Sequence, residues 1–190
     1  QAGATLARLH LECADYPRQS DFAPLSAANQ IGPFCDELAG WLAGVPGDHA
    51  PLLAALERIK ARWAGAGLEN LPQGICHRDY RAANLLVSGG AIQAVLDFET
   101  ARWDTWTNDL SHALVFLGTM YRGWEPIAPA SQREFLAGYA GVRPLDEEER
   151  AIMPALVQLH SIELGRATNT EEARRRSLGR AAEYAAEAKG

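Results

Sequence analysis

The sequence predicts an α+β fold that is predominantly helical and carries one small β-hairpin near its centre. Three observations lead to this prediction. Apolar residues recur at helical spacing through most of the chain. A short strand–turn–strand pattern interrupts that periodicity near residues 84–96. The length of 190 residues, with 47% hydrophobic and 22% charged residues, is typical of one globular domain, and we expect residues 1–190 to form one.

Three helices are expected before the hairpin. Their apolar residues recur within residues 2–13, 34–42 and 52–63. Proline or glycine residues follow each stretch and are expected to end it. Asp48 shortly precedes the third stretch, so we expect it to be the N-cap of that helix.

The hairpin is expected between residues 84 and 96. Residues 84–87 and 92–96 indicate two strands, because both are short and rich in Leu, Ile and Val. Ser88-Gly89-Gly90 lies between them and is typical of a tight turn. The short apolar segment 74–76 precedes this region.

Helical periodicity resumes after the hairpin. The later helices are expected at residues 109–117, 131–139, 147–164 and 171–189. Ser131 is the expected N-cap of the second of these, with Glu134 in the capping-box position three residues later. Asp146 is the expected cap of the third, in which Pro154 implies a kink or a later start.

The charge balance argues against a nucleic acid partner, and the hydropathy argues against a membrane. The formal net charge is −6, whereas binding of nucleic acid needs clustered Lys and Arg. The dense basic run at residues 174–176 adjoins Glu171 and Glu172, so we interpret it as a solvated helix face. No apolar run approaches the roughly 20 residues of a membrane span.

The cysteines indicate a reducing compartment. Cys13, Cys35 and Cys76 are an odd number at scattered spacing, which forms neither a disulfide framework nor a zinc knuckle. Buried, reduced thiols in a cytoplasmic protein are the favoured interpretation.

The most informative motif lies between residues 77 and 99. His77-Arg78-Asp79-Tyr80-Arg81-Ala82-Ala83-Asn84 fits the catalytic-loop pattern H-R-D-x-x-x-x-N of kinases. Asp97-Phe98-Glu99 begins thirteen residues after Asn84, directly behind an apolar strand. It holds the position of the metal-binding D-F-G of kinases, with Glu in place of Gly.

The chemistry of phosphoryl transfer explains these residue types. The reaction needs a hydroxyl aimed in line at the γ-phosphorus and neutralisation of the phosphate oxygens. A carboxylate at Asp79 can orient that hydroxyl and accept its proton. Asn84 and Asp97 offer the hard oxygen ligands that suit Mg²⁺. Because Asn84 begins one strand and Asp97 ends the other, antiparallel pairing is expected to bring both beside the loop that carries Asp79.

Taken singly, each of these residues has a plainer explanation. An Asp after a strand is usually a turn former, and an Asn before a strand is often a loop residue. The fixed spacing on a loop–strand–turn–strand frame is what favours the catalytic loop. Two other functions stay open. One is a catalytically silent kinase lobe that binds a ligand or partner. The other is a metal-dependent hydrolase, which would need more histidines near the site than His77.

These motifs resemble the aminoglycoside phosphotransferase family, which includes homoserine and choline kinases. The resemblance rests on residues 77–84, 95–98 and 108–110, and extends more weakly to the Leu-His of the first helix and to residues 135–145. It implies the C-terminal lobe of a protein-kinase-like fold. It also implies ATP and Mg²⁺ as cofactors and a small-molecule alcohol as the phosphate acceptor.

The resemblance also assigns roles to residues. It implies that Asp79 is the catalytic base and that Asn84 and Asp97 are metal ligands. It implies that Asp109 braces the catalytic loop, the alternative being an ordinary N-cap, and we expect His77 to pack and hold that loop. Choline kinases have a carboxylate near the metal at the position of Glu99, for which a surface Glu is the alternative.

The acceptor is expected between the catalytic loop and the helices after Asp109. Aromatic rings beside a carboxylate are suited to a cationic amine. The candidate lining groups of this kind are Trp103, Asp104, Trp106, Tyr121 and Trp124. The alternative is that the Trp residues are core or lobe-surface anchors. The resemblance suggests an amino alcohol such as homoserine, choline or an aminoglycoside as the substrate.

The parts that clamp the nucleotide in such kinases are not in this sequence. Neither a Gly-rich phosphate loop nor a strand with an ATP-pairing Lys precedes His77. The sequence also opens inside an apparent helix. We therefore expect an N-terminal nucleotide lobe upstream in the same polypeptide, with a naturally shortened relative as the alternative. Alone, the present lobe is expected to bind Mg-ATP weakly and to turn over poorly.

Overall fold

The computed structural model describes residues 1–16, 27–65, 70–119, 124 and 126–187. The helices in these residues are α1 (Ala2–Glu12), α2 (Ala27–Ala43), α3 (Ala50–Gly65), α4 (Trp106–Phe116), α5 (Pro129–Ala140), α6 (Glu147–Ala167) and α7 (Glu171–Glu187). The strands are β1 (Gln73–Cys76), β2 (Leu85–Ser88), β3 (Ala91–Val95) and β4 (Arg102–Thr105). The predicted fold class, predominantly helical with a small central hairpin, is confirmed.

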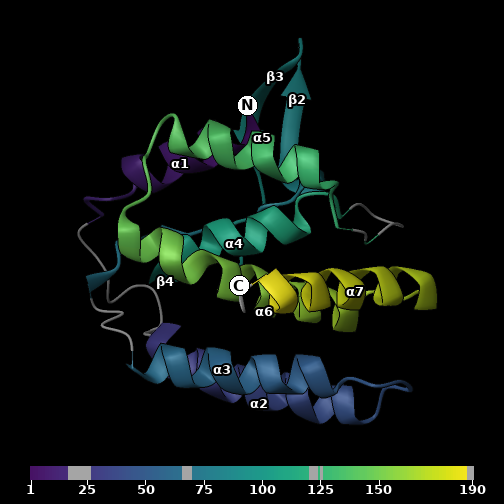
Figure 1. Ribbon diagram of the computed structural model, residues 1–190. Coiled ribbons are helices and arrows are strands. Elements are labelled where there is room, and N and C mark those ends of the chain that lie inside the picture. The colour runs from purple at the N-terminus through teal and green to yellow at the C-terminus, as the bar shows by residue number, and fades with distance from the viewer. Residues whose placement is uncertain (17–26, 66–69, 120–123, 125, 188–190) are drawn as a thin grey trace.

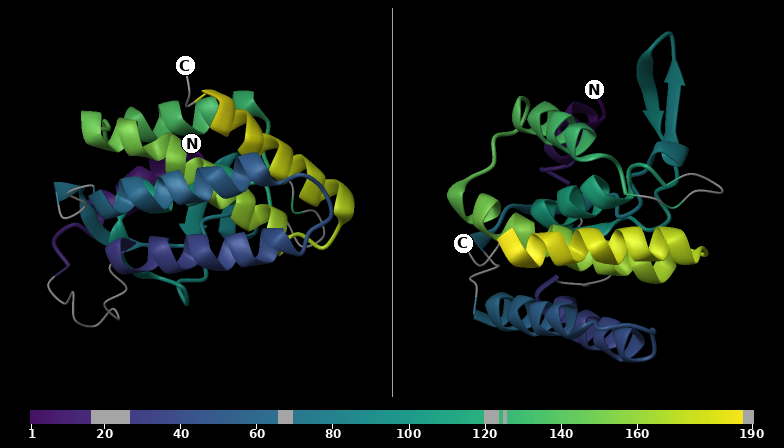
Figure 2. Two further views of the ribbon diagram at one scale, coloured as in Figure 1. Left: turned by 60° about the horizontal axis from the view of Figure 1, so that its bottom comes forward. Right: turned by 45° about the vertical axis from the view of Figure 1, so that its right-hand side comes forward.

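The helices pack as pairs stacked in layers (Figure 1). α2 lies against α3, α6 against α7, and α1 against α5, while α4 packs on α6 between the last two pairs. The right-hand view of Figure 2 shows the same stacking, with the β2–β3 hairpin projecting beyond the helices. The apolar faces of the amphipathic helices predicted from the sequence are thus buried between paired helices.

Two apolar clusters form the core. One joins α2 and α3 to α6 and α7, and its fully buried members include Leu38, Leu56 and Leu159. The other lies around α1, α4 and α5 and contains Tyr80 and Tyr139, both fully buried. Because Tyr80 belongs to the catalytic-loop motif, the second cluster anchors that loop to the helices.

The hairpin matches the predicted one to within a residue at each end. β2 and β3 pair antiparallel from Leu85↔Val95 to Ser88↔Ala91. Gly89 and Gly90 have φ values of 59° and 74°, which two-residue hairpin turns require and which glycine adopts without strain. Asn84 does not begin the strand as predicted. It closes a short 3₁₀ helix over Ala82–Asn84, directly before β2.

A second pair of strands was not predicted from the sequence. β1 and β4 pair antiparallel from Gln73↔Thr105 to Cys76↔Arg102. The β1 strand corresponds to the apolar segment 74–76. This ladder brings residues 76 and 102 together. Residues 77–101, which contain the catalytic-loop motif and the hairpin, therefore leave the helical core and return to it at the same place.

Three helix starts differ from their predictions. α2 begins at Ala27 and contains Pro33, well before the expected residue 34. α5 begins at Pro129 with Ala128 as N-cap, so the predicted Ser131 cap is wrong. Pro fits the first helical turn because the N–H that it lacks has no helical partner there. α3 begins at Ala50, two residues before the expected stretch, and His49 supplies its first carbonyl acceptor, so Asp48 lies one residue before the N-cap position that was predicted for it. Asp48 still accepts a 3.0 Å hydrogen bond from the Ala50 N–H.

The start of α6 agrees with its prediction. Asp146 is the N-cap, and it forms a capping box with Glu149 in which each side chain accepts from the other residue's backbone N–H. The helix continues from Glu147 through Pro154 to Ala167, so the later start that Pro154 suggested is not observed.

The described helices contain no segment that is both long and apolar enough to span a membrane. The cysteines are free thiols, with Cys35 and Cys76 buried and Cys13 partly exposed. Burial raises the pKa of Cys35 to about 12, so this thiol stays protonated at neutral pH.

Candidate active site

His77 ties the catalytic-loop motif to the hairpin. Its side chain is fully buried. Its Nε2 donates to the carbonyl oxygen of Leu96 at 2.9 Å, and its Nδ1 accepts from the Asp79 N–H at 3.2 Å. The ring also packs against Phe98, with 4.6 Å between ring centroids. His77 therefore holds the backbone at Leu96 and at Asp79, and its ring packs on the Phe98 side chain just after Asp97.

Asp79 and Asn84 are in direct contact. The amide nitrogen of Asn84 donates to Oδ2 of Asp79 at 2.8 Å and to its carbonyl oxygen at 2.9 Å. Those bonds use both amide protons, so the amide oxygen is the group left to face a cation. Arg81 Nε donates to the same Asp79 Oδ2 at 3.0 Å. The carboxylate is thereby oriented by two donors while its side chain stays 24% exposed.

Asp97 lies at the same end of the hairpin as Asn84. It is exposed and follows β3 by two residues. The Leu96 N–H donates to the Asn84 carbonyl at 2.8 Å, which extends the ladder to the site. Asp97 has a positive φ of 66°, a conformation that an L-residue keeps only where its surroundings enforce it. The backbone of the chain thus brings Asp97 to the end of the hairpin where Asn84 and Asp79 are in contact.

Asp109 is the fully buried support of this loop. Its Oδ2 accepts from the His77 N–H at 2.9 Å and its Oδ1 from the Arg78 N–H at 2.8 Å. His10 Nε2 contacts Oδ2 at 3.0 Å. The N-cap alternative for Asp109 is wrong, because α4 begins at Trp106 with Thr105 as N-cap.

The surroundings of the Asp109 carboxyl lower its pKa. Burial alone would raise its pKa, but the hydrogen bond and charge of His10, together with Arg78, hold that pKa well below its ordinary value. A permanently ionised acceptor suits a group that must hold two backbone N–H groups at neutral pH.

Two of the predicted acceptor residues lie inside the protein. Trp106 is 8% exposed and stacks on His10, with 5.5 Å between ring centroids. Asp104 is 1% exposed and accepts from Asn108 Nδ2 at 3.0 Å and Arg102 Nε at 3.3 Å. Both are interior anchors, so the prediction that they line an acceptor site is not supported by their positions.

The other candidate residues are accessible to different degrees. Trp103 is half-buried in β4 and faces Ile75 across the ladder. Trp124 is half-buried beneath the Arg81 guanidinium, whose central carbon lies 5.6 Å from the ring centroid. Glu99 is exposed, two residues beyond Asp97. Tyr121 lies outside the described residues.

Arg81, which the sequence analysis did not single out, belongs to the site. It joins Asp79 on one side to Trp124 on the other. Its place two residues after Asp79 was the available signal, since an Arg so close to a carboxylate within one loop can reach it. Trp124 supplies the second contact and comes from the segment after α4, which spacing alone does not connect to the loop.

A buried group of metal-binding residue types lies behind the loop. The ligand atoms of His10, Cys76 and Asp109 fall within 4.8 Å of one another. These side chains already satisfy one another or the backbone, and burial raises the pKa of the Cys76 thiol well above its ordinary value. A neutral thiol is a poor metal ligand, so this group is better explained by hydrogen bonding.

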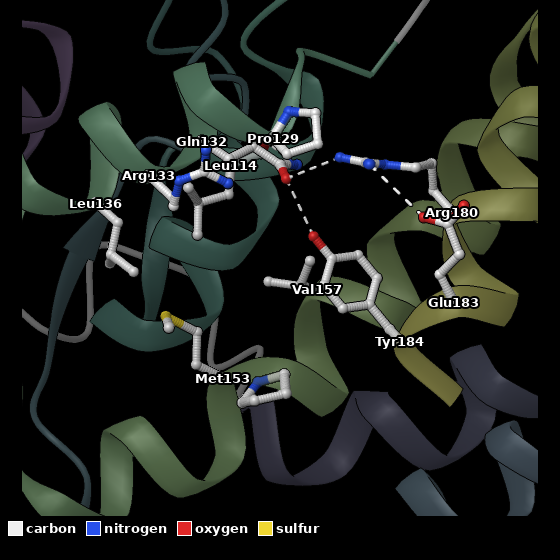
Figure 3. Close-up of a pocket in the computed structure, with 11 residues that line it drawn as sticks. Leu114, Pro129, Gln132, Arg133, Leu136, Met153, Val157, Arg180, Glu183 and Tyr184 are labelled. Atoms are coloured by element: carbon white, nitrogen blue, oxygen red, sulfur yellow. Dashed lines mark hydrogen bonds and ion pairs between the residues drawn. The ribbon is translucent and has the colours of Figure 1, made fainter. Parts of the chain in front are cut away.

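A depression of about 420 Å³ lies away from the loop, among α4, α5, α6 and α7 (Figure 3). Apolar residues such as Leu136, Met153 and Val157 form its floor. Gln132 crosses its rim and accepts from Tyr184 Oη at 3.1 Å and Arg180 Nη2 at 3.2 Å. None of the predicted site residues lines it.

Comparison with known proteins follows the catalytic-loop motif. A family model described as the phosphotransferase enzyme family matches residues 1–152. Homoserine kinase of Gluconobacter oxydans (strain 621H) is 30% identical over 160 residues, which cover 83% of this chain and 48% of that protein. Homoserine kinase of Neisseria meningitidis serogroup B (strain ATCC BAA-335 / MC58) is 32% identical over 157 residues, covering 80% and 47%.

A third relative and a solved structure agree with these matches. Homoserine kinase of Hyphomonas neptunium (strain ATCC 15444) is 34% identical over 164 residues, covering 81% of this chain and 48% of that protein. The chain spans about half the length of the curated relatives it matches. The structure of the microcompartment-associated aminopropanol kinase has a TM-score of 0.50 and 22% identity, over 99% of this chain and 60% of that one. That likeness concerns the fold.

Proposed function

Because this chain belongs to the phosphotransferase enzyme family, we propose that it is the catalytic lobe of an ATP-dependent kinase for a small-molecule alcohol. The observation that carries the proposal is the contact between Asp79 and Asn84 at the hairpin end where Asp97 also lies. Packing alone does not require these three polar residues to gather on a half-open rim. Phosphoryl transfer does require such a group.

The oxygen donors at the rim fit a magnesium ion. The Asn84 amide oxygen and the Asp97 carboxylate are hard ligands of the kind that Mg²⁺ prefers, and the exposure of Asp97 leaves room for phosphate and water ligands. Bound there, the ion would neutralise charge on the phosphate oxygens of ATP. The backbone bond between Leu96 and Asn84 would hold the two ligands at one end of the hairpin.

Asp79 is the proposed catalytic base. Its Oδ2 is held by Asn84 and Arg81, which leaves Oδ1 to accept the proton of an incoming hydroxyl. Arg81 keeps the carboxylate from rotating, and its ring contact with Trp124 limits its own movement. His77 and Asp109 are proposed to brace the loop, because both bond to its backbone.

The proposed acceptor is an amino alcohol. The relatives that the sequence matches are named homoserine kinases, and the solved neighbour is an aminopropanol kinase. Trp124 and Trp103 are the half-buried aromatic candidates for cradling an amine, with Tyr121 proposed from the sequence alone and Glu99 as a carboxylate near the metal. Trp106 and Asp104 are not part of this proposal because they are buried.

The proposal needs a second lobe to cover the nucleotide. The chain spans about half of its curated relatives, and a cover over the ATP phosphates is required for efficient transfer. We propose that the complete polypeptide supplies that lobe and acts in the cytoplasm, with neither nucleic acid nor a membrane as a partner.

The test is ATP turnover by the complete enzyme with a panel of small alcohols that includes homoserine, choline, aminopropanol and aminoglycosides. Asp79→Asn is expected to lower kcat by about 1,000-fold while ATP binding stays within about threefold, because the base acts only in the chemical step. Asp48→Asn is the matched control, since Asp48 lies just before α3, where it accepts from the Ala50 N–H.

Two outcomes would count against the proposal. Equal turnover by the wild type and by Asp79→Asn would remove Asp79 as the base. Binding of Mg-ATP without turnover of any alcohol would favour a silent binding lobe over a kinase.

A further inference from the structure

The depression among α4, α5, α6 and α7 combines an apolar floor with a polar rim (Figure 3). Leu114 and Val157 are buried in its floor, while Leu136 and Met153 are half-buried and present apolar surface to it. Its volume of about 420 Å³ falls within the range of roughly 300–1,000 Å³ that is typical of small-molecule sites. The flexible thioether of Met153 can also adapt to bound molecules of different shapes. The floor is therefore suited to a small apolar group.

The Gln132 amide holds the rim of this depression together. Its Nε2 donates to the Leu114 carbonyl oxygen at 3.1 Å. Its Oε1 accepts from Tyr184 Oη at 3.1 Å and from Arg180 Nη2 at 3.2 Å. These hydrogen bonds join α5 to α4 and to α7. The protein itself thus organises the rim, and a ligand that binds there does not have to order it.

Two arginines flank Gln132 at this rim. Figure 3 shows Arg133 to one side of Gln132 and Arg180 to the other. The Arg180 side chain donates to Gln132, but its Nη1 lies 3.6 Å from Glu183 Oε2, beyond hydrogen-bond distance. Arg133 is exposed and forms neither a hydrogen bond nor an ion pair with any other residue that the structure describes. Because a guanidinium carries several N–H donors, most of the donors at this rim are available to an anion.

The surroundings of the depression are basic as well. A second depression of about 500 Å³ adjoins it between α3 and α6, since Pro154 and Tyr184 line both. Arg58 and Arg62 line this second depression, and no acidic residue lines it among those that the structure describes. Across the two depressions, the described lining residues include four arginines and one glutamate. On a chain with a formal net charge of −6, this local positive charge favours an anionic ligand over a cationic one.

We propose that the depression among α4, α5, α6 and α7 binds a small carboxylic acid that carries an apolar chain. Its carboxylate accepts hydrogen bonds from Arg133 and Arg180, since a guanidinium matches the geometry of a carboxylate. Its apolar chain lies on Leu136, Met153 and Val157. None of the residues proposed for catalysis or metal binding lines this depression. Binding there requires no phosphate transfer, so it is independent of the proposed function.

A gap left by imperfect helix packing would behave differently from such a site. An apolar gap takes up uncharged molecules at least as readily as ions, because an ion loses its hydration there without gaining a partner. The two arginines reverse that order, since a charge-assisted hydrogen bond is stronger than a neutral one. Ligands with the same chain and different head groups therefore distinguish a carboxylate site from a gap.

The first experiment follows the Met153 methyl signal by NMR in the full chain, with Met153→Leu used to assign that signal. Octanoate is the probe, and octanol and octylamine are the matched compounds. Octanoate is expected to shift the signal with a Kd of about 1 mM, as the modest binding free energy per atom of small ligands implies. Octanol is expected to bind about tenfold more weakly, and octylamine more weakly than octanol. A Met153 signal that about 10 mM octanoate does not shift would overturn the proposal. So would equal Kd values for octanoate and either matched compound.

The second experiment tests the rim with variants that leave the apolar core intact. Arg133→Gln and Arg180→Gln are each expected to weaken octanoate binding by about tenfold, because each removes charge-assisted donors. Arg175→Gln is the matched control. It removes the same charge from α7, but Arg175 lines a different depression, beside the start of α3. The Kd of this control should stay within about twofold of the wild type. Unchanged affinity in both rim variants would overturn the proposal, and so would an equal loss in all three variants.

Discussion

At the scale of single residues, the proposed site depends on backbone shapes that most side chains avoid. Arg78 and Asp97 have φ values of 64° and 66°, a conformation that costs an ordinary L-residue roughly 1–2 kcal/mol. The Arg78 N–H is held by Asp109, and Asp97 directly follows the bond between Leu96 and Asn84. Those hydrogen bonds offset the backbone strain at Arg78 and Asp97, and they fix the direction of the chain on either side of each residue.

Replacement of Asp97 by Asn tests the metal assignment. The change keeps the shape and removes the negative charge, so Mg²⁺ should bind more weakly and kcat/KM should fall by about 100-fold at limiting Mg²⁺. A Mg²⁺ titration of ATP turnover in the complete enzyme measures this.

In the same titration, Glu99→Gln should raise the Mg²⁺ concentration needed for half-maximal turnover only if Glu99 lies near the metal. A wild-type Mg²⁺ dependence in Asp97→Asn would remove Asp97 as a ligand.

The residues of the candidate site differ in whether the sequence pattern that predicts them lies within one short segment. The placement of Asp79, Asn84 and Asp97 at one end of the hairpin could be predicted because one motif with fixed spacing contains all three. His10 could not be linked to Asp109, because the two lie 99 positions apart and meet only through helix packing. Burial of Trp106 and Asp104 is likewise a tertiary property, and residue type alone made both look like ligand-binding groups.

At the scale of elements, α1 and α5 cross at two glycines. A Cβ added at Gly3 would overlap the carbonyl oxygen of Phe135 and come within 2.8 Å of the Tyr139 nitrogen. Gly138 lies on the other side of the same contact, 3.5 Å from the Ala4 nitrogen by its own added Cβ. This close approach sets the distance between the helices that carry His10 and Tyr139.

Gly3→Ala is therefore expected to destabilise the protein by about 3 kcal/mol, because backbone atoms cannot move aside as a side chain can. Gly40→Ala is the matched control on α2, where an added Cβ meets nothing within 4 Å. Ala has the higher helix propensity, so the control should gain about 0.5–1 kcal/mol. Urea unfolding measures both changes. Equal stability of the two variants would contradict the tight crossing.

Helices and strands whose sequence patterns lie within a short segment were predicted. Strands that form only by pairing with a segment distant in the sequence were not. The helical periodicity and the Asp146 cap were sufficient because each is encoded within a few turns. β4 was missed because polar and apolar residues alternate only weakly over Arg102–Thr105. Its partner β1 is also distant in the sequence, since residues 77–101 lie between the two strands. The Ser131 cap failed because Pro129 competes for the helix start, a choice that spacing alone does not decide.

At the scale of the whole molecule, buried histidines link stability to pH. Burial lowers the pKa of His112 from 6.5 to about 3, although the nearby Glu163 partly opposes this. Burial also lowers the pKa of His160, whose ring meets His112 edge-on at 5.1 Å. As pH falls below 6.5, the unfolded chain binds protons that the folded chain does not, so stability is lost as pH falls.

Each such group is expected to contribute a slope that approaches about 1.4 kcal/mol per pH unit at roughly one pH unit below its unfolded pKa. His112→Phe should therefore reduce the pH dependence of the free energy of unfolding by about that amount per unit between roughly pH 6 and pH 5. Urea unfolding at several pH values measures the slope independently of any change in absolute stability. An unaltered slope in the variant would contradict the burial of a neutral His112.

The ladder between β1 and β4 holds together the two ends of the segment 77–101, which contains the catalytic-loop motif and the hairpin. Its entry and exit, Cys76 and Arg102, are paired neighbours, and the hairpin tip is its most distant point. Insertions at Gly89 and Gly90 would lengthen that outer arm without altering the spacing of the groups near its base.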